Sequence, residues 1–471
     1  MLNKTGEIAY LDKISSLFFF LSSDYHGKMD DKKPIEDKVT PLAVTNWRDI
    51  KRKFGIRQKN RRGHIYIIGK TGTGKSSLIG NMIISDLAEG AGLALIDPHG
   101  DLAATLLDYV PENRVQDVIY FNPADLEYPI AFNPLESVDP NNNHLVVSGL
   151  ISVFKKIWAE FWGPRLEHIL RHSLLTLLEI PGSTLLDIPQ LLTNPYFRKE
   201  IVSRINHQDV KTFWFSEFDH YSAWLKAEAT APILNKVGQF LTSLPIRNVV
   251  GQSRSSFNFR ELMDQGRILI VNLAKGGIGE DASALIGAMI VTEVQLAALS
   301  RVDVPESQRK SFYLYVDEVH NFLTSSFVDV LSESRKYGLN LTLANQFTGQ
   351  LSESMQAAIF GNVGTLISFR VGVEDAELLS KEFYPVFTLS DLVNLPNYSI
   401  YLKLMIDGVT SNPFSASTLP LPPITASFAD QIILSSRKRY ARARKEVEAT
   451  ITSRFTKRYP QDTRQPTLFS S

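Results

Sequence analysis

The segment from residue 69 to residue 76 has the residue types and spacing with the clearest chemical meaning. It runs Gly-Lys-Thr-Gly-Thr-Gly-Lys-Ser and fits the P-loop pattern G-x-x-x-x-G-K-[ST]. In such a loop the glycines let backbone N–H groups surround phosphate oxygens at the positive end of the following helix. Lys75 then reaches the β- and γ-phosphates, and the Ser76 hydroxyl coordinates Mg²⁺. The pattern predicts a nucleoside triphosphate site whose contacts come from Gly69, Lys70, Thr71, Gly72, Thr73, Gly74, Lys75, Ser76 and Ser77.

A P-loop works with a carboxylate that holds the Mg²⁺ ion and its water shell. The apolar segment 312–316 is followed directly by Asp317 and Glu318. We assign Asp317 as the Mg²⁺ partner and Glu318 as the base that polarises the attacking water. The sequence has no Asn-Lys-x-Asp segment of the kind that recognises guanine, so ATP is the expected nucleotide.

Three further polar residues lie at the ends of predicted elements. Gln346 ends an apolar strand, where it is either a γ-phosphate sensor or an ordinary polar loop residue. Arg335 ends the helix that follows Glu318. Its charge either complements the helix dipole or reaches the ATP of a neighbouring subunit as an arginine finger. Arg370 follows another apolar strand and is a second candidate for that finger.

Strands and helices must alternate to position these residues. Short apolar runs rich in β-branched residues predict buried parallel strands. They lie at 64–68, 93–96, 118–121, 267–272, 312–316, 340–346 and 365–370. Helical spacing of apolar residues follows the first run at 76–87. This order of strand, helix and strand predicts an α/β fold with a doubly wound, mostly parallel sheet.

The alternation stops between residues 141 and 260, where helical patterns follow one another, so we predict an all-helical insert. The basic stretch 51–62 is either a surface turn or a phosphate contact, and the basic C-terminal tail is either a terminal helix or a partner- and nucleic-acid-binding segment. The expected domains are an N-terminal arm or linker at 1–50, an ATPase domain at 51–140 and 261–426, the insert at 141–260, and the tail at 427–471.

The composition excludes several classes of protein. The chain has 471 residues with 50 basic and 50 acidic side chains, which fits neither a disordered chain nor a uniformly basic nucleic-acid coat. It has no cysteine, which excludes a disulfide scaffold, a thiolate zinc site and an iron–sulfur cluster. The apolar run at 17–21 is too short for a signal peptide or a membrane-spanning helix. We expect a cytoplasmic protein without a transmembrane segment, and a short amphipathic membrane contact at 17–21 is the alternative.

The predicted helical insert contains two further groups of residues that could have a chemical function. His168 and His172 share one helix face, but no third ligand accompanies them, so we expect a packing role rather than a metal site. Aromatic residues at helical spacing either stack on nucleic-acid bases or form the core of the insert, and we expect the core. They are Trp158, Phe161, Trp162, Phe213, Trp214, Phe215 and Trp224.

The ordered series of motifs resembles the FtsK–HerA superfamily of DNA-pumping ATPases. The series consists of the P-loop, Asp97-Pro98-His99-Gly100-Asp101, Val316-Asp317-Glu318, Ser334-Arg335-Lys336-Tyr337-Gly338 and Ala344-Asn345-Gln346. The helical insert resembles the all-alpha domain of conjugative type IV secretion coupling proteins of the TraD/TrwB type. The resemblance covers about residues 60–410.

This resemblance implies a RecA-like motor domain and a role for each matched residue. It implies phosphate and Mg²⁺ contacts for Lys75 and Ser76, the Mg²⁺ and base pair for Asp317 and Glu318, the trans-acting finger for Arg335 and the γ-phosphate sensor for Gln346. Asp97 and His99 resemble a strand-end motif near the nucleotide. Because eleven residues separate Arg335 from Gln346, we expect both to face the same edge of the sheet.

The function implied by the resemblance is a ring-shaped, Mg²⁺- and ATP-dependent DNA translocase, expected as a homo-hexamer. A relaxase or a secretion-channel component is the expected protein partner, and any membrane association would come through such partners. Coupling proteins usually carry N-terminal membrane helices, and HerA-type enzymes an N-terminal β-barrel; we predict neither here. Two alternatives stay open: a HerA-like repair or packaging motor, and an ATP-gated adaptor that docks a relaxase–DNA complex without translocation.

Overall fold

The computed structural model describes residues 38–46, 51–136, 142–324 and 326–458. Within these ranges the chain divides into two compact units. The first unit comprises residues up to Phe121 together with Phe259–Lys275 and Ile290–Ser435, and the second comprises Asn122–Asn258, Gly276–Met289 and the residues from Ser436 onward. The apolar run at 17–21 lies outside the described residues. Each unit is described by itself.

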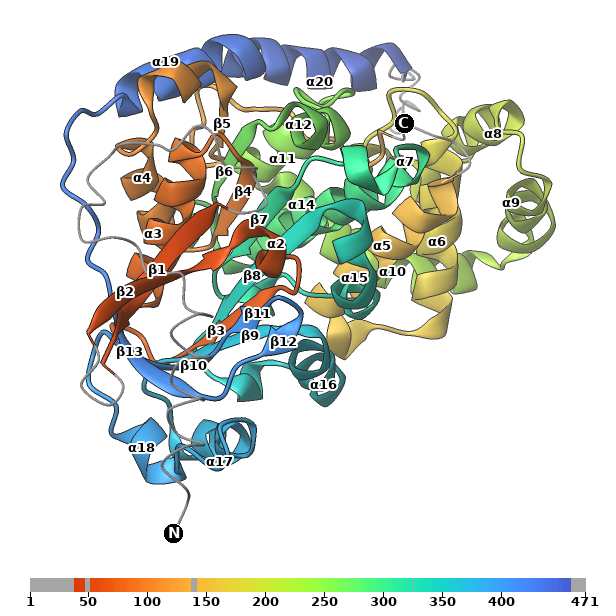
Figure 1. The fold of residues 1–471 in the computed structure, drawn as a ribbon. Coiled ribbons are helices and arrows are strands. Elements are labelled where there is room, and N and C mark those ends of the chain that lie inside the picture. The colour runs from red at the N-terminus through yellow and green to blue at the C-terminus, as the bar shows by residue number, and fades with distance from the viewer. Residues whose placement is uncertain (1–37, 47–50, 137–141, 325, 459–471) are drawn as a thin grey trace, which may run out of the picture. The chain divides into compact units, whose positions relative to one another are not determined.

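The first unit is built on an eleven-stranded sheet with the order β2-β1-β13-β10-β9-β3-β8-β7-β4-β6-β5 (Figure 1). Its strands are β1 (Val39–Thr45), β2 (Arg52–Arg57), β3 (Ile65–Ile68), β4 (Gly92–Asp97), β5 (Val118–Phe121), β6 (Ile268–Asn272), β7 (Phe312–Val316), β8 (Leu339–Asn345), β9 (Thr365–Ser368), β10 (Ser399–Lys403) and β13 (Phe414–Thr418). The strands from β9 to β5 pair in parallel, and the other four extend the sheet in antiparallel fashion. A small hairpin of β11 (Met405–Ile406) and β12 (Val409–Thr410) stands beside it.

Predominantly apolar sequences explain the parallel strands. Every residue of β3, β4, β6, β7, β8 and β9 is buried, as expected for strands that are covered on both faces. Helices α3 (Lys75–Ala88) and α4 (Asp101–Leu107) contribute apolar side chains to the same core as these strands. The remaining helices of this unit are α2 (Gln58–Arg61), α12 (Phe259–Gln265), α15 (Phe327–Glu333), α16 (Glu353–Asn362), α17 (Val373–Glu382) and α18 (Leu389–Val393), with 3₁₀ turns η3 (Glu112–Asp117), η9 (Ser300–Asp303), η10 (Glu306–Gln308), η11 (Val319–Asn321), η12 (Ser334–Tyr337) and η13 (Thr348–Gln350).

The second unit consists of helices, and its described residues add only one isolated bridge, between Ile130 and Ala441. Trp158, Phe213 and Trp214 are buried in it, whereas Phe161, Phe215 and Trp224 are exposed, so the predicted aromatic core is only partly right. Its elements are α5 (Asn143–Ile157), η5 (Ala159–Phe161), α6 (Pro164–Leu178), η6 (Leu185–Asp187), α7 (Ile188–Thr193), α8 (Pro195–Arg204), α9 (Gln208–Thr212), the π-helix η7 (Phe213–Glu217), η8 (Phe218–His220), α10 (Ala223–Thr242), α11 (Leu244–Val250) and α20 (Arg444–Arg458).

Three helices cross the boundaries between the units: α13 (Lys275–Ile278), α14 (Glu280–Leu299) and α19 (Ala429–Tyr440). The segment Glu280–Asp303, which contains α14, is the only one among the described residues that is long and apolar enough to cross a membrane, and 72% of its most apolar window is buried inside the structure. The core helix of a folded domain has the same properties. In the tail, Val447 and Ile451 of α20 pack against Leu186 within the second unit, and Arg454 bonds Asp187.

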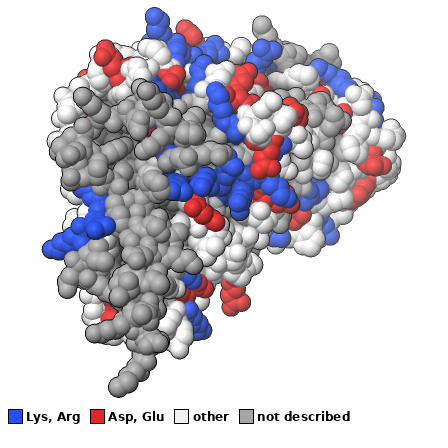
Figure 2. Space-filling view, viewed as in Figure 1, with Lys and Arg blue, Asp and Glu red and all other residues white. Residues whose placement is uncertain are grey.

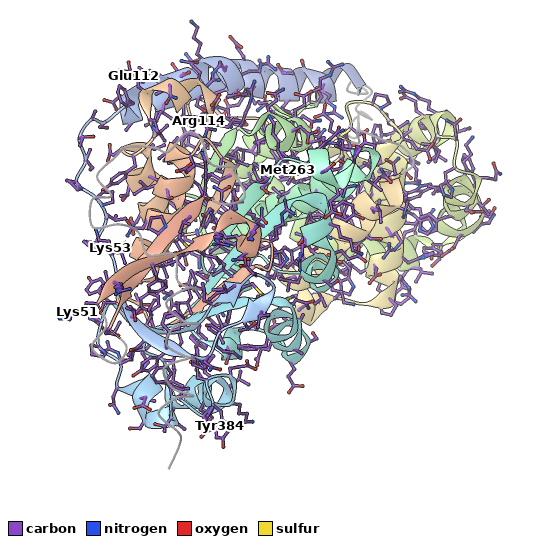
Figure 3. The ribbon with its side chains drawn as sticks, viewed as in Figure 1. Lys51, Lys53, Glu112, Arg114, Met263 and Tyr384 are labelled. Carbon is purple, nitrogen blue, oxygen red and sulfur yellow. The ribbon has the colours of Figure 1, made fainter. Side chains whose placement is uncertain are left out.

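The N-terminal region differs from the expectation of an arm and a surface turn. Residues 39–45 form β1, which pairs with both β2 and β13, so part of the predicted linker belongs to the central sheet. Lys51 and Lys53 lie together at the start of β2, the edge strand of the sheet (Figure 3). Arg61 is buried instead of exposed, and its guanidinium donates to Asp86 and to the Tyr315 hydroxyl. It therefore contributes to the core and does not contact phosphate.

Candidate functional site

The P-loop follows β3 directly and ends where α3 begins, as its sequence pattern predicts. Gly72 and Gly74 have φ angles of 76° and 119°, a region in which residues with a side chain are strained. Gly69 is needed for a different reason: a Cβ there would lie 2.5 Å from the Cβ of Phe369. The loop is held from two neighbouring strands, because Gly69 N–H donates to the Asn345 carbonyl and Lys70 N–H donates to the Arg370 carbonyl.

The Lys75 side chain folds back over the loop that carries it. Its Nζ atom donates to the Gly69 carbonyl at 2.5 Å and lies 3.3 Å from the Lys70 carbonyl. Burial lowers the pKa of Lys75, while the negative charges of Glu318 and Asp317 act in the opposite direction. The ammonium group thus lies on the phosphate-binding loop, within range of the charges of the predicted Mg²⁺ ligand Asp317 and the predicted base Glu318.

Asp317 and Glu318 follow β7 at the same edge of the sheet. Burial, together with the neighbouring charges of Glu318 and Asp97, raises the pKa of Asp317 to about 6 against the opposing charge of Lys75. Glu318 has a left-handed backbone with φ of 45°, which is strained for a residue of this type. Its backbone N–H donates to Asp317 Oδ1 at 2.9 Å. Three acids and one lysine therefore share this part of the sheet edge.

The Glu318 carboxylate is held at one oxygen only. Gln346 Nε2 donates to Oε1 at 2.8 Å, which joins the predicted sensor to the predicted base. The Oε2 atom is buried and has no hydrogen-bond partner among the described residues. His320 Nδ1 lies 3.5 Å from it, but that nitrogen is closer to Asn345 Oδ1, at 2.9 Å. A buried carboxylate oxygen without a hydrogen-bond donor is energetically costly. This oxygen is therefore suited to accept a hydrogen bond from a water molecule or from another donor that arrives with the substrate.

A small amide network around the acids was missed by sequence reasoning. His320 interacts with Asn345 through Nδ1 and with Gln350 through Nε2, at 2.9 and 3.2 Å. The signal was available, because His320 is two residues beyond the acid pair and Asn345 directly precedes Gln346. The network fixes the turns that carry Glu318 and Gln346.

Asp97 and His99 have different positions at the end of β4. Asp97 is buried and accepts the backbone N–H groups of His99 and Ala103, each at 2.9 Å. It therefore fixes the start of α4 and adds negative charge beside Asp317. The His99 side chain is exposed.

Arg335 lies at the opposite edge of the sheet from Gln346, so the expectation of a shared edge is wrong. It belongs to η12, which directly precedes β8, whereas Gln346 directly follows β8. A strand of this length separates its two ends by about 20 Å. Arg335 is exposed. Figure 2 shows basic side chains gathered over α2 on the visible face of the first unit. Arg335 therefore cannot reach the P-loop of its own chain.

Arg370 lies beside the P-loop of its own chain. Its carbonyl accepts the Lys70 N–H at 2.9 Å, and its guanidinium Nη2 donates to Asn397 Oδ1 at 2.9 Å. This position suits a residue that supports the nucleotide site of its own chain better than one that reaches a neighbouring copy.

The donor set fits Mg²⁺. The Ser76 hydroxyl and the Asp317 carboxylate are hard oxygen ligands of the kind this ion prefers, and Asp97 and Glu318 add negative charge beside Asp317. Among the described residues no group of three or more His, Cys, Asp or Glu side chains is arranged to hold a metal ion by itself. His168 and His172 pack against Phe213 instead.

Comparison with known proteins gives one family. A model of the family described as the type IV secretion-system coupling protein DNA-binding domain matches residues 53–383. No sequence among the curated proteins matches the chain.

Several solved structures share the fold. The bacterial conjugative coupling protein TrwB, in an unbound form lacking its first 70 residues, is similar with a TM-score of 0.60 at 16% identity, over 83% of this chain and 91% of that one. TrwB in complex with ADP and Mg²⁺ gives the same score and identity over 92% of its length. VirB4 of Thermoanaerobacter pseudethanolicus is similar with a TM-score of 0.56 at 15% identity, over 99% of its length. These similarities establish a RecA-like α/β fold.

Proposed function

Because the chain belongs to the family of type IV secretion-system coupling protein DNA-binding domains, we propose that it is a Mg²⁺-dependent ATPase that moves DNA. The observation that carries the proposal is the convergence of the P-loop, Asp317, Glu318 and Gln346 at one edge of the sheet. The relative TrwB was crystallised with ADP and Mg²⁺, which supports the same cofactors here.

The proposed chemistry assigns one task to each residue. The loop backbone and Lys75 bind the phosphates of ATP, and Ser76 and Asp317 would hold Mg²⁺, whose charge offsets that of the phosphates. Glu318 accepts a hydrogen bond from the attacking water at its unpartnered Oε2, while Gln346 keeps the other oxygen in place. Gln346 would also sense the γ-phosphate, because its amide is hydrogen-bonded to the base that acts on that phosphate's attacking water.

The proposed assembly is a homo-hexameric ring. In a head-to-tail ring one edge of each subunit faces a different edge of the next, so two unlike surfaces meet at every interface. The position of Arg335 at the edge away from its own P-loop supports its role as a finger directed at the neighbouring copy's ATP. The proposed DNA contact is largely independent of base sequence and is made through the phosphate backbone. We place the protein in the cytoplasm, with a relaxase or secretion-channel component as its partner.

The test is the ATPase rate of the purified chain with and without DNA over a series of salt concentrations. The proposal predicts stimulation by DNA that weakens as salt rises, because phosphate contacts release counterions. The Glu318→Gln variant must lose both the basal and the stimulated rate. A wild-type rate that is indifferent to DNA at every salt concentration would contradict the motor and favour an ATP-gated adaptor for a relaxase–DNA complex.

A further inference from the structure

The turn between α18 and β10 brings an aromatic residue onto the P-loop. Tyr398 N–H donates to the Thr73 carbonyl at 2.8 Å, and its own carbonyl accepts the Thr418 N–H at 2.8 Å. The backbone of Tyr398 is left-handed, with φ of 63°, which is unfavourable for a bulky residue. It is thus fixed from both sides, by the phosphate-binding loop and by β13.

The Tyr398 ring lies against the last glycine of the loop. A Cβ atom on Gly74 would lie 2.9 Å from Tyr398 Cδ1, so the ring and the loop backbone are in direct contact. Tyr398 as a residue is nevertheless 55% exposed. The strained backbone therefore does not serve to bury the ring in the core, as it would for an ordinary core aromatic residue. It holds an accessible aromatic surface at the rim of the phosphate-binding loop.

A second contact holds the same turn. Arg370 donates through Nη2 to Asn397, the residue before Tyr398, and accepts the Lys70 N–H at its carbonyl. Phe369 is fully buried, and its ring would lie 3.1 Å from a Cβ on Gly74. The 397–398 turn, the end of β9 and the P-loop therefore form one connected wall, and Tyr398 is its exposed aromatic member.

We propose that Tyr398 is the surface on which the base of the bound nucleotide stacks. This inference rests on the proposed function, because it takes the P-loop as the phosphate site. A nucleotide whose phosphates occupy the loop extends its sugar and base over an adjacent surface, and a flat aromatic ring in contact with the loop provides one. Stacking uses the face that every base has, so it favours nucleotides over bare phosphates without selecting adenine over guanine. Arg370 is the positioning residue that holds the turn.

The experiment compares the binding of ATP, GTP and inorganic tripolyphosphate, each with Mg²⁺, by calorimetry. Tyr398→Asn removes the ring with a residue that tolerates the left-handed backbone, and Tyr398→Phe keeps the ring. The inference predicts that Tyr398→Asn weakens ATP and GTP binding equally, by about tenfold, and leaves tripolyphosphate binding unchanged. Tyr398→Phe must bind all three as the wild type does. Tyr196→Ala, which removes a tyrosine that is 87% exposed in the second unit, serves as the matched control.

Two results would overturn the inference. Equal weakening of ATP and tripolyphosphate would mean that the ring only supports the loop, and unchanged ATP binding by Tyr398→Asn would mean that the base lies elsewhere. Failure of the proposed function looks different: the wild type would bind none of the three ligands, or Lys75→Ala would bind ATP as well as the wild type does.

Discussion

The two edges of the parallel sheet in the first unit differ in almost every physical property. The carboxyl edge carries the P-loop, buried acids, a strained Glu318 and a buried carboxylate oxygen that has no hydrogen-bond partner in the described part of the chain. The amino edge carries Arg335 and Lys336, both exposed and basic, on a 3₁₀ turn. Buried groups with unmet hydrogen-bonding needs are typical of a site that acts on substrate. Exposed cations on a fixed turn are suited to a partner outside the chain. The difference supports the proposal that each edge is one half of a site.

The amino edge is also held in a defined way. His64 is buried beneath it, with Nδ1 accepting the Leu341 N–H and Nε2 bonded to the Ser334 hydroxyl, each at 3.2 Å. Because Nδ1 is an acceptor, the proton of the neutral ring is on Nε2, which faces the Ser334 hydroxyl and the Leu331 backbone. Ser334 directly precedes Arg335, so the ring fixes the turn that carries the proposed finger.

The largest predicted effect on activity comes from a substitution at the amino edge. Arg335→Ala should lower kcat by about 10³-fold or more, because a finger that stabilises charge in the transition state has an effect of this size. ATP binding should change little, since Arg335 lies far from the P-loop of its own chain. Lys336→Ala is the matched control and should retain most of the activity. Steady-state kinetics and ATP binding measured together check this prediction, and a wild-type kcat for Arg335→Ala would contradict it.

The next largest effect comes from a substitution at the carboxyl edge that keeps the shape of the side chain. Glu318→Gln should lower kcat by about 10²- to 10³-fold, because the amide cannot accept a proton from water. Its side chain can still meet Gln346 by turning its carbonyl oxygen toward that residue. ATP affinity should therefore equal or exceed that of the wild type. Retained hydrolysis in this variant would remove Glu318 from the mechanism.

The smallest predicted effect concerns the amino edge, where the buried His64 makes the stability of the fold depend on pH. Burial lowers the pKa of His64 to about 4, with the Arg335 charge acting in the same direction. At His64 the unfolded chain then binds more protons than the folded one between about pH 6.5 and pH 4, so the contribution of this residue to stability falls by about 3 kcal/mol as pH falls through this window. His64→Asn tolerates the positive φ and should flatten this part of the stability profile. Urea midpoints across the window measure it, and an unchanged slope would contradict the assignment.

Much of this organisation could be predicted from the sequence, for a physical reason. Strands β3 and β7 are continuous apolar runs, and β8 alternates leucines with Asn340 and Thr342. All three lead into polar residues, and the carboxyl ends of parallel strands meet at one edge. That rule brings the P-loop, Glu318 and Gln346 together. The relation of Arg335 to Gln346 was wrong because the residues between them include the whole of β8, so the chain crosses the sheet before it reaches Gln346.

Other features could not be predicted because they depend on contacts distant in sequence. Arg61 stands within a basic run, yet its partners Asp86 and Tyr315 are 25 and 254 residues away. No local pattern distinguishes this buried arginine from its exposed neighbours. Strands β1, β2 and β13 lie at the antiparallel end of the sheet, where sequences with mixed polarity are tolerated. The role of Tyr398 likewise depends on a turn closed by Thr73 and Thr418.

The central claim is that the two edges act in adjacent copies, and a mixing experiment tests it most directly. Arg335→Ala and Glu318→Gln chains, each inactive alone, are combined in equal amounts, and DNA-stimulated ATP hydrolysis is measured. Random mixing in a head-to-tail ring gives about a quarter of the interfaces an intact Glu318 from one copy and an intact Arg335 from the next, so about a quarter of wild-type activity should return. Lys75→Ala mixed with Glu318→Gln should recover nothing, because both changes affect the same edge. No recovery in the first mixture, or equal recovery in both, would contradict the account.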